Sequence, residues 1–128
     1  MSLTTIRGLK SEIFVPITPS PVWASLDKPL SECTVAFCTA GGVHLKSQKR
    51  FNLSGDYSFR EIPSETPASE LMVSHGGFDN SDVNKDINSM FPIDRLHELE
   101  REGFIGKVAP VLFGFMGGGG NVNKFKEE

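Results

Sequence analysis

The residues best suited to chemistry lie in the segment Ser74-His75-Gly76-Gly77. His75 follows a short apolar run and precedes two glycines, which is typical of a side chain at the end of a strand. An imidazole in that position could move protons near neutral pH. We therefore take His75, Ser74 and, farther along, Asp79 as candidate catalytic residues near the substrate. The alternative is that His75 is structural, as a lone histidine often is.

His44 occupies a similar position, because it follows Gly41-Gly42-Val43. We place it at the same substrate edge, together with Gly76 and Gly77, and a structural role is again the alternative. His97 stands beside Leu96 in a predicted helix, where we expect it to be structural.

The run Gly117–Gly120 could cradle a phosphate with its backbone N–H groups. It matches neither the Walker pattern, because no Lys-Ser/Thr follows, nor G-x-G-x-x-G with a later acidic residue. The alternatives are a flexible turn, or room for close approach by another chain. We assign Gly117 and Gly118 to the substrate edge.

The two cysteines, Cys33 and Cys38, flank an expected strand. An extended strand would separate them by roughly 16 Å, too far for a disulfide. We expect two reduced thiols, at least one of them buried.

No metal site is predicted, because no His/Cys/Asp cluster has zinc spacing. Asp82-x-Asn84-x-Asp86 begins like a calcium-binding EF-hand loop. However, Ile87 stands where such a loop needs glycine, and Ile93 stands where it needs a bidentate glutamate. We expect these polar side chains to form turns and to cap the helix that follows.

Three predicted strands each end at glycine, and they would position these residues. They are Thr34–Ala40, Glu70–His75 and Val108–Met116. The first of them, Thr34–Ala40, is nearly all apolar or small and ends at glycine, which is typical of a strand buried on both faces of a parallel sheet. The carboxyl ends of such strands line one edge, where ligands and catalytic groups gather.

The pattern predicts one helix, over Pro92–Glu102. Pro92 suits the first helical position, and Gly103 suits the position just beyond the helix. An apolar stripe at helical spacing consists of Ile93, Leu96 and Leu99. Strand, helix and strand in this order imply a right-handed crossover and parallel pairing of the strands at 70–75 and 108–116.

The expected fold class is therefore α/β, with three layers and a mostly parallel, Rossmann-like sheet that is an incomplete part of a larger domain. Residues 1–32 form an irregular Pro-rich arm, and residues 33–128 form the α/β domain. Residues 44–69 form a long polar connection that could contain a half-exposed strand at Tyr57–Ile62. Loops of this length are often functional.

Composition excludes several classes of protein. The chain has 128 residues, 38% of them hydrophobic, and a formal net charge of −3. A phosphate-binding surface needs a basic excess, so we expect no nucleic-acid partner. No apolar stretch is long enough to span a bilayer, and the start of the chain has no secretory signal. We expect a cytoplasmic protein that does not bind membranes.

Five stretches of the sequence together resemble one known family. They are Gly42–Ser47, Phe59–Pro63, Val73–Asn80, Phe91–Leu96 and Glu100–Gly106. They resemble, in the same order, the selenoprotein B family of glycine, sarcosine, betaine and D-proline reductases. The opening SEIFVPITPSPVW and the late GFMGGGG are most similar to the selenocysteine-containing D-proline branch.

This resemblance implies a reductive cleavage of a carbon–nitrogen bond. D-proline would be opened to 5-aminovalerate at the expense of dithiols, as in amino-acid fermentation by the Stickland reaction. The family chemistry implies a pyruvoyl group on a partner subunit, which condenses with the ring nitrogen, and a selenolate that attacks the α-carbon. The partners implied are that pyruvoyl-containing subunit and a small amino acid, in a hetero-oligomer, and no cofactor is expected in this chain.

One departure from the family matters. The family's selenocysteine follows the glycine-rich segment, whereas this sequence stops at Glu128. We therefore expect the chain to be the N-terminal part of the subunit and to be inactive alone, and we assign the nucleophile to no residue present. The alternatives are a protein B subunit of glycine, sarcosine or betaine reductase, and a non-catalytic scaffold or assembly domain of such a complex.

Overall fold

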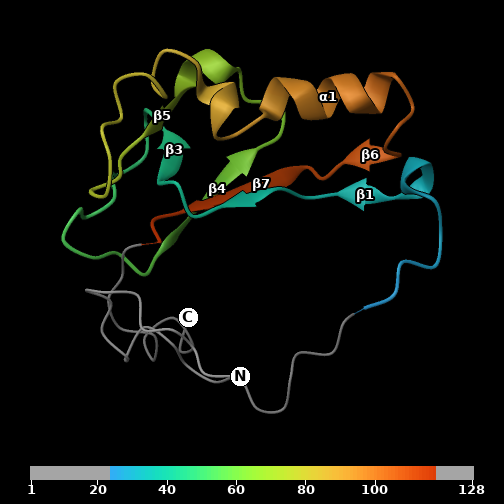
Figure 1. The fold of residues 1–128 in the computed structure, drawn as a ribbon, viewed down its shortest axis with the longest axis horizontal. Coiled ribbons are helices and arrows are strands. Elements are labelled where there is room, and N and C mark those ends of the chain that lie inside the picture. The colour runs from blue at the N-terminus through green and yellow to red at the C-terminus, as the bar shows by residue number, and fades with distance from the viewer. Residues whose placement is uncertain (1–23, 118–128) are drawn as a thin grey trace, which may run out of the picture.

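Two stretches of chain, one near each end of the described part, run side by side and organise the fold (Figure 1). The computed structural model describes residues 24–117. Strands β1 (Thr34–Val35) and β2 (Cys38–Thr39) pair in parallel with β6 (Lys107–Val108) and β7 (Val111–Phe115) respectively. Backbone hydrogen bonds from Ala109 to Val35 and from Phe113 to Phe37 bridge the gap between the two pairs. The predicted strands at 34–40 and 108–116 are thus present, each in two pieces.

Two further pairings are antiparallel. Strand β4 (Phe59–Pro63) joins the other edge of β7, which gives the order β2-β7-β4 for the central sheet. Strands β3 (Val43–Leu45) and β5 (Leu71–Val73) form a separate pair. This pair crosses closely over the sheet, because a Cβ on Gly114 of β7 would lie 2.0 Å from the Val43 carbonyl oxygen.

Helix α1 (Ile93–Arg101) is the one α-helix of the described residues, and its bounds fall within one residue of those predicted. Asn88 and Asp94 exchange hydrogen bonds at its start, from the Asp94 amide to Asn88 Oδ1 and from Asn88 Nδ2 to Asp94 Oδ2. Gly103 just beyond the helix has a φ of +76°, as its predicted role requires. Pro92 lies one residue before the helix rather than in its first position. Between residues 24 and 117 there are also three short 3-10 helices: η2 (Leu30–Glu32), η3 (Ala68–Glu70) and η4 (Ile87–Ser89).

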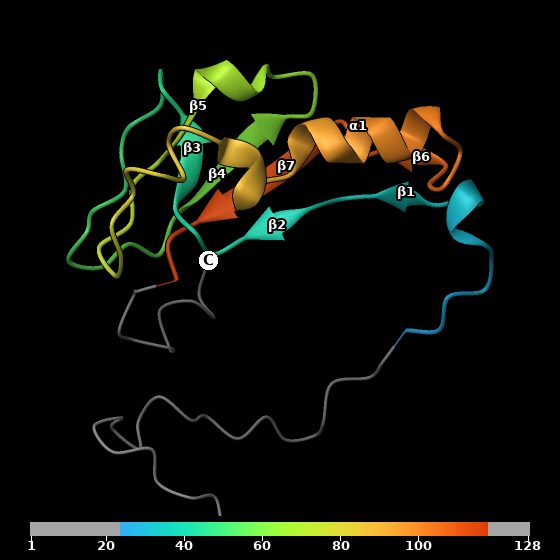
Figure 2. The same ribbon diagram turned by 45° about the horizontal axis from the view of Figure 1, so that its top comes forward.

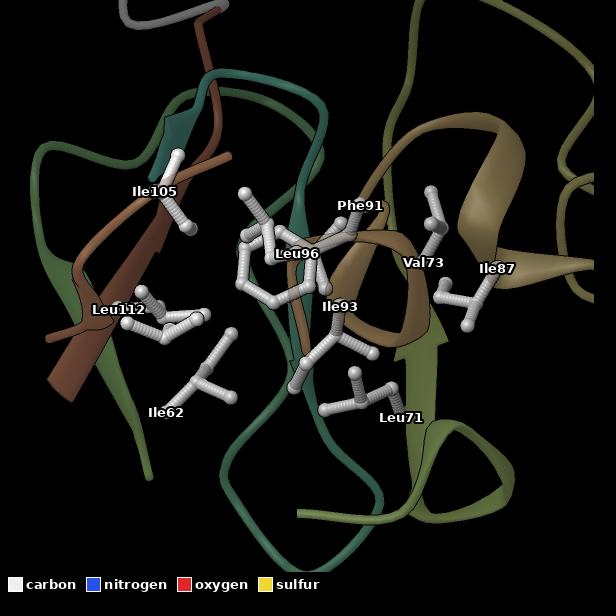
Figure 3. Close-up of a cluster of buried hydrophobic side chains, with 11 residues drawn as sticks. Ile62, Leu71, Val73, Ile87, Phe91, Ile93, Leu96, Ile105 and Leu112 are labelled. Carbon is white, nitrogen blue, oxygen red and sulfur yellow. The ribbon is translucent and has the colours of Figure 1, made fainter. Parts of the chain in front are cut away.

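The core lies between α1, the β3–β5 pair and one face of the central sheet (Figure 3). Ile93 and Leu96 of α1 face Leu112 of β7 and Ile62 of β4. Leu99, the third member of the predicted stripe, is 39% exposed and lies outside this core. Figure 2 shows α1 and the β3–β5 pair on the same side of the sheet, with no described helix or strand on the other side.

The expected fold class is therefore confirmed only as α/β. The mostly parallel, Rossmann-like arrangement is not confirmed, because the sheets are mixed: among the described strands, two of the four pairings are antiparallel. The predicted parallel pairing of the strands at 70–75 and 108–116 is wrong. Strand β5 instead pairs with β3, and β7 takes β2 as its parallel partner.

The polar connection at 44–69 is also more structured than predicted. It begins within β3 and contains all of β4, which lies close to the half-exposed strand expected at Tyr57–Ile62. No helix of the described residues is long and apolar enough to cross a membrane. Most of the Pro-rich arm, residues 1–23, and the glycines after Gly117 lie outside the described residues.

Candidate functional site

The glycine-ended strands meet at one place. The Gly42 amide donates to the Phe115 carbonyl, and the Ser74 amide donates to the Gly42 carbonyl, both at 2.9 Å. The Gly117 amide donates to Ala40 at 3.0 Å. The structure thus brings Gly42, Ser74 and Gly117 together, whereas Gly118 lies outside the described residues.

Gly42 makes the closest of these approaches possible. It has a φ of +75°, and a Cβ there would lie 2.2 Å from the Ser74 carbonyl oxygen. A left-handed backbone conformation and a contact this short both require glycine. Gly42 therefore sets the distance between β3 and the end of β5, and so the position of Ser74.

His44 and Ser74 form a buried hydrogen-bonded pair. His44 is completely buried and Ser74 is 8% exposed. His44 Nδ1 lies 2.7 Å from the Leu45 carbonyl oxygen, which can only accept, so this nitrogen carries the proton. His44 Nε2, 2.9 Å from Ser74 Oγ, is then the acceptor for the Ser74 hydroxyl. Burial lowers the pKa of His44, and so do the positive charges of Arg60 and Arg50, which keeps the ring neutral.

The loop after β3 covers this pair. The Phe51 ring meets His44 edge-on, with 5.8 Å between ring centroids, and the Arg60 guanidinium lies 4.3 Å from the Phe51 centroid. Asp56 lies 3.9 Å from Arg60 and accepts hydrogen bonds from the amides of Asn52 and Ser58. The sequence did not predict this covering loop, because no motif or residue spacing indicates that a loop folds back over the strand before it.

Gly76 fits beneath the same loop. A Cβ on Gly76 would lie 2.9 Å from the Leu53 carbonyl oxygen. The loop therefore reaches from His44 to the turn after β5, and it closes one side of the candidate site.

His75 and Asp79 are engaged within their own turn. His75 is half-buried, accepts a hydrogen bond from the Gly77 amide at 2.9 Å and stacks on Phe78. Asp79 is exposed and accepts from the amide and hydroxyl of Ser81, hydrogen bonds that lower its pKa. Among the described residues, no hydrogen bond or ion pair joins Asp79 to the His44–Ser74 pair. The structure thus places Ser74 with His44 rather than with the other two candidates.

His97 connects two elements. Its Nε2 donates to the Ser64 carbonyl at 2.8 Å, and its Nδ1 lies 3.2 Å from Glu100. The hydrogen bond to Ser64 and the nearby Glu100 and Glu65 carboxylates raise the pKa of His97. His97 thus links α1 to the end of β4, as a structural residue would.

Neither cysteine lies in the candidate site. Both are free thiols, as predicted: Cys33 is buried and donates to the Pro29 carbonyl, whereas Cys38 is exposed. Within residues 24–117, no group of three His, Cys, Asp or Glu side chains could hold a metal ion.

The Asp82–Asp86 segment forms turns, as expected, but its capping side chain serves the 3-10 helix η4 rather than the predicted helix α1. Asp86 accepts from the Asn88 amide at the start of η4, and Asp82 pairs with Lys85. The Asn84 side chain binds both backbone groups of Val73, at 2.7 and 3.4 Å, and so closes the free edge of β5.

Comparison with known proteins gives consistent matches over nearly the whole chain. The family described as glycine/sarcosine/betaine reductase selenoprotein B matches residues 9–127. The D-proline reductase subunit gamma of Acetoanaerobium sticklandii is 60% identical over 126 residues, which are 98% of this chain and 52% of that protein.

More distant relatives belong to related complexes. A glycine reductase complex component B subunit gamma from Symbiobacterium thermophilum is 30% identical over 91% of this chain and 30% of its own length. A sarcosine reductase complex component B subunit beta from Peptoclostridium acidaminophilum is 30% identical over 94% of this chain and 30% of its own length. The chain thus spans about half, or less, of the curated relatives it matches. No solved structure gives a significant match.

Proposed function

Because this chain belongs to the glycine/sarcosine/betaine reductase selenoprotein B family, we propose that it is the N-terminal part of the selenoprotein subunit of a D-proline reductase. The observation that carries this proposal is its 60% identity to a D-proline reductase subunit gamma over 98% of the chain. The glycine and sarcosine reductase subunits reach only 28–31%.

The proposed reaction is the reductive opening of D-proline to 5-aminovalerate with dithiols, in the fermentation of amino acids. A pyruvoyl group on a partner subunit would supply an electrophile, and a selenocysteine outside the described residues would supply the nucleophile. The contacts of this chain agree with that division, because neither Cys33 nor Cys38 touches the His44–Ser74 pair. The two free thiols suit a reducing compartment, so the proposal includes a cytoplasmic location.

The His44–Ser74 pair is the proposed contribution of this chain to the substrate edge. Neutral His44 accepts the hydrogen bond that the Ser74 hydroxyl donates, which leaves the lone pairs of Ser74 Oγ able to accept a further hydrogen bond. Such an oxygen suits the protonated amine of an amino-acid substrate. His44 is then a positioning residue, because it acts only through Ser74.

A chimeric enzyme tests the proposal. The 126 matched residues of the Acetoanaerobium subunit are replaced by the aligned residues of this chain, and the complex is assayed with D-proline and dithiothreitol. We expect 5-aminovalerate, because at 60% identity the substituted half should preserve the site. In the same chimera, Ser74→Ala should raise KM more than it lowers kcat, whereas exposed Ser69→Ala should change neither.

Two results would contradict the proposal. One is a chimera that assembles normally but does not turn over D-proline. The other is a chimera that reduces glycine, sarcosine or betaine instead, which would favour a protein B subunit of those reductases. A chimera that assembles and stays silent with all four substrates would favour a scaffold role.

A further inference from the structure

The central sheet has one face that is apolar and open. Side chains of β2 and β7 that are paired in register point to the same side, as Cys38 and Phe113 do. Phe59 is paired with Phe115, and Pro63 is paired with Val111. These residues alternate with Leu112 and Ile62, which are in the core, so they point away from it. We call this surface the open face; it consists of Ala36, Cys38, Phe59, Pro63, Val111, Phe113 and Phe115.

Among the described residues, several side chains of the open face are exposed to solvent. Phe59 is 51% exposed, Cys38 and Pro63 are exposed, and Phe113 is half-buried with its ring 5.9 Å from that of Phe59. Glu61 is paired with Phe113 between Phe59 and Pro63, so it points to the same side and places one charged side chain within the open face. A sheet with one face in water normally carries polar side chains there, so a face that is apolar except for Glu61 indicates an interaction surface.

Strand direction indicates what kind of layer covers it. The pairs β1–β6 and β2–β7 are parallel, whereas β4 joins β7 antiparallel. All-parallel sheets occur almost only with both faces covered, so the parallel half of this mixed sheet favours a second covering layer. Helix α1 covers one face, and no described helix or strand covers the other (Figures 1 and 2). The layer that completes such a sheet is made of helices with apolar sides.

The length of the relatives indicates which polypeptide segment supplies the covering layer. The matched 126 residues are only 52% of the Acetoanaerobium subunit, so that polypeptide contains nearly as much chain again. We propose that the open face binds this remaining part of the subunit, through a layer of amphipathic helices packed on Phe59, Phe113 and Phe115. The inference requires family membership but not D-proline turnover, so its test measures binding alone.

Cys38 is a built-in reporter for this contact, because it lies on the open face and Cys33 does not. The 128-residue chain is co-expressed with the unmatched part of the Acetoanaerobium subunit as a separate polypeptide, and alkylation is followed by mass spectrometry of the cysteine peptides. We expect the two polypeptides to co-purify in equal amounts. Alkylation of Cys38 should be at least about tenfold slower in the complex than in the isolated chain. The size of the decrease depends on the fraction of the chain that remains unbound. Buried Cys33 should react slowly with or without the partner.

Two exposed phenylalanines provide matched variants. Phe59→Ser removes an aromatic side chain from the open face, and Phe104→Ser removes one that is 64% exposed beyond α1. Both should leave the isolated chain folded, since neither ring is buried. We expect Phe59→Ser to weaken the complex at least about tenfold, and Phe104→Ser to leave it unchanged.

Three outcomes would overturn the proposal. Cys38 could react equally fast with and without the second polypeptide. It could already be protected in the isolated chain, either by a second copy, seen as a dimer by light scattering, or by residues of the same monomer. Finally, Phe59→Ser and Phe104→Ser could weaken the complex equally.

Discussion

The hydroxyl of Ser74 fills the last hydrogen-bonding position of a buried imidazole. Replacing Ser74 with alanine would leave His44 Nε2 without a partner in a place where the ring is completely buried. An unsatisfied buried acceptor costs about 1–3 kcal/mol, so Ser74→Ala should lower the free energy of unfolding by that amount. Urea denaturation measures this change.

Ser69→Ala is the matched control, because Ser69 is an exposed serine in η3. It should change stability by less than about 0.5 kcal/mol. Equal effects of the two variants would mean that the His44–Ser74 hydrogen bond contributes nothing specific.

Two histidines should have pKa values on opposite sides of the ordinary histidine value of 6.5. The pKa of His44 is lowered by burial, so its stabilising contribution is complete above pH 6.5 and is lost as the pH falls through the lowered pKa. The pKa of His97 is raised by its bond to Ser64, so its contribution is complete below pH 6.5 and is lost as the pH rises through the raised pKa. Proton NMR titration should show His44 changing at lower pH than His97. The reverse order would exclude the neutral His44 inferred above.

Sequence patterns predicted the individual elements better than their pairing. The helix was placed within a residue, because proline, an amphipathic stripe and Gly103 all mark it locally. Strand β3 was missed, because three residues with a histidine in the middle have no readable alternation. The partner of β5 could not be predicted, since β3 pairs with it through contacts between residues distant in sequence.

The candidate site shows the same limit at the level of elements. Its glycine-ended strands were predicted, and the structure brings Gly42, Ser74 and Gly117 together. His44 and Ser74 were both named, but no pattern could show that β3 and β5 lie side by side and so join the two side chains. The covering loop depends on Phe51 and Arg60, whose packing is a tertiary contact with no sequence signature.

Gly42 and Gly103 both have a positive φ, but only Gly42 also lies too close to a neighbouring strand to carry a side chain. Both have nearly the same φ, but a Cβ on Gly42 would meet the end of β5, whereas a Cβ on Gly103 would meet nothing within 4 Å. Gly103→Ala should therefore cost only the backbone strain, about 1–2 kcal/mol. Gly42→Ala should cost about 3 kcal/mol or more, because β3 and β5 must also move apart. Thermal unfolding of the two variants compares them, and equal costs would contradict the close approach.

At the scale of the whole molecule, the parallel strand pairs and the open face agree with the proposal that this chain is one part of a larger subunit. The chain contains a core and a hydrogen-bonded His–Ser pair. Its thiols lie elsewhere: Cys33 is buried and Cys38 is on the open face, opposite the side that β3 crosses. Reductive cleavage of a carbon–nitrogen bond needs a soft nucleophile such as a thiolate or selenolate. Among the described residues, no such group lies beside the His44–Ser74 pair.

The purified 128-residue chain should therefore produce no 5-aminovalerate from D-proline and dithiothreitol. The physical reason is that reductive cleavage requires a redox-active nucleophile that attacks the α-carbon and an electron-accepting carbonyl bound to the ring nitrogen. A Ser–His pair supplies neither. Chromatographic detection of 5-aminovalerate measures the outcome, with the intact Acetoanaerobium reductase as the positive control. Turnover by the isolated chain, abolished by Cys38→Ser, would show that this thiol serves as the nucleophile and would overturn the proposed division of labour between the subunit's parts.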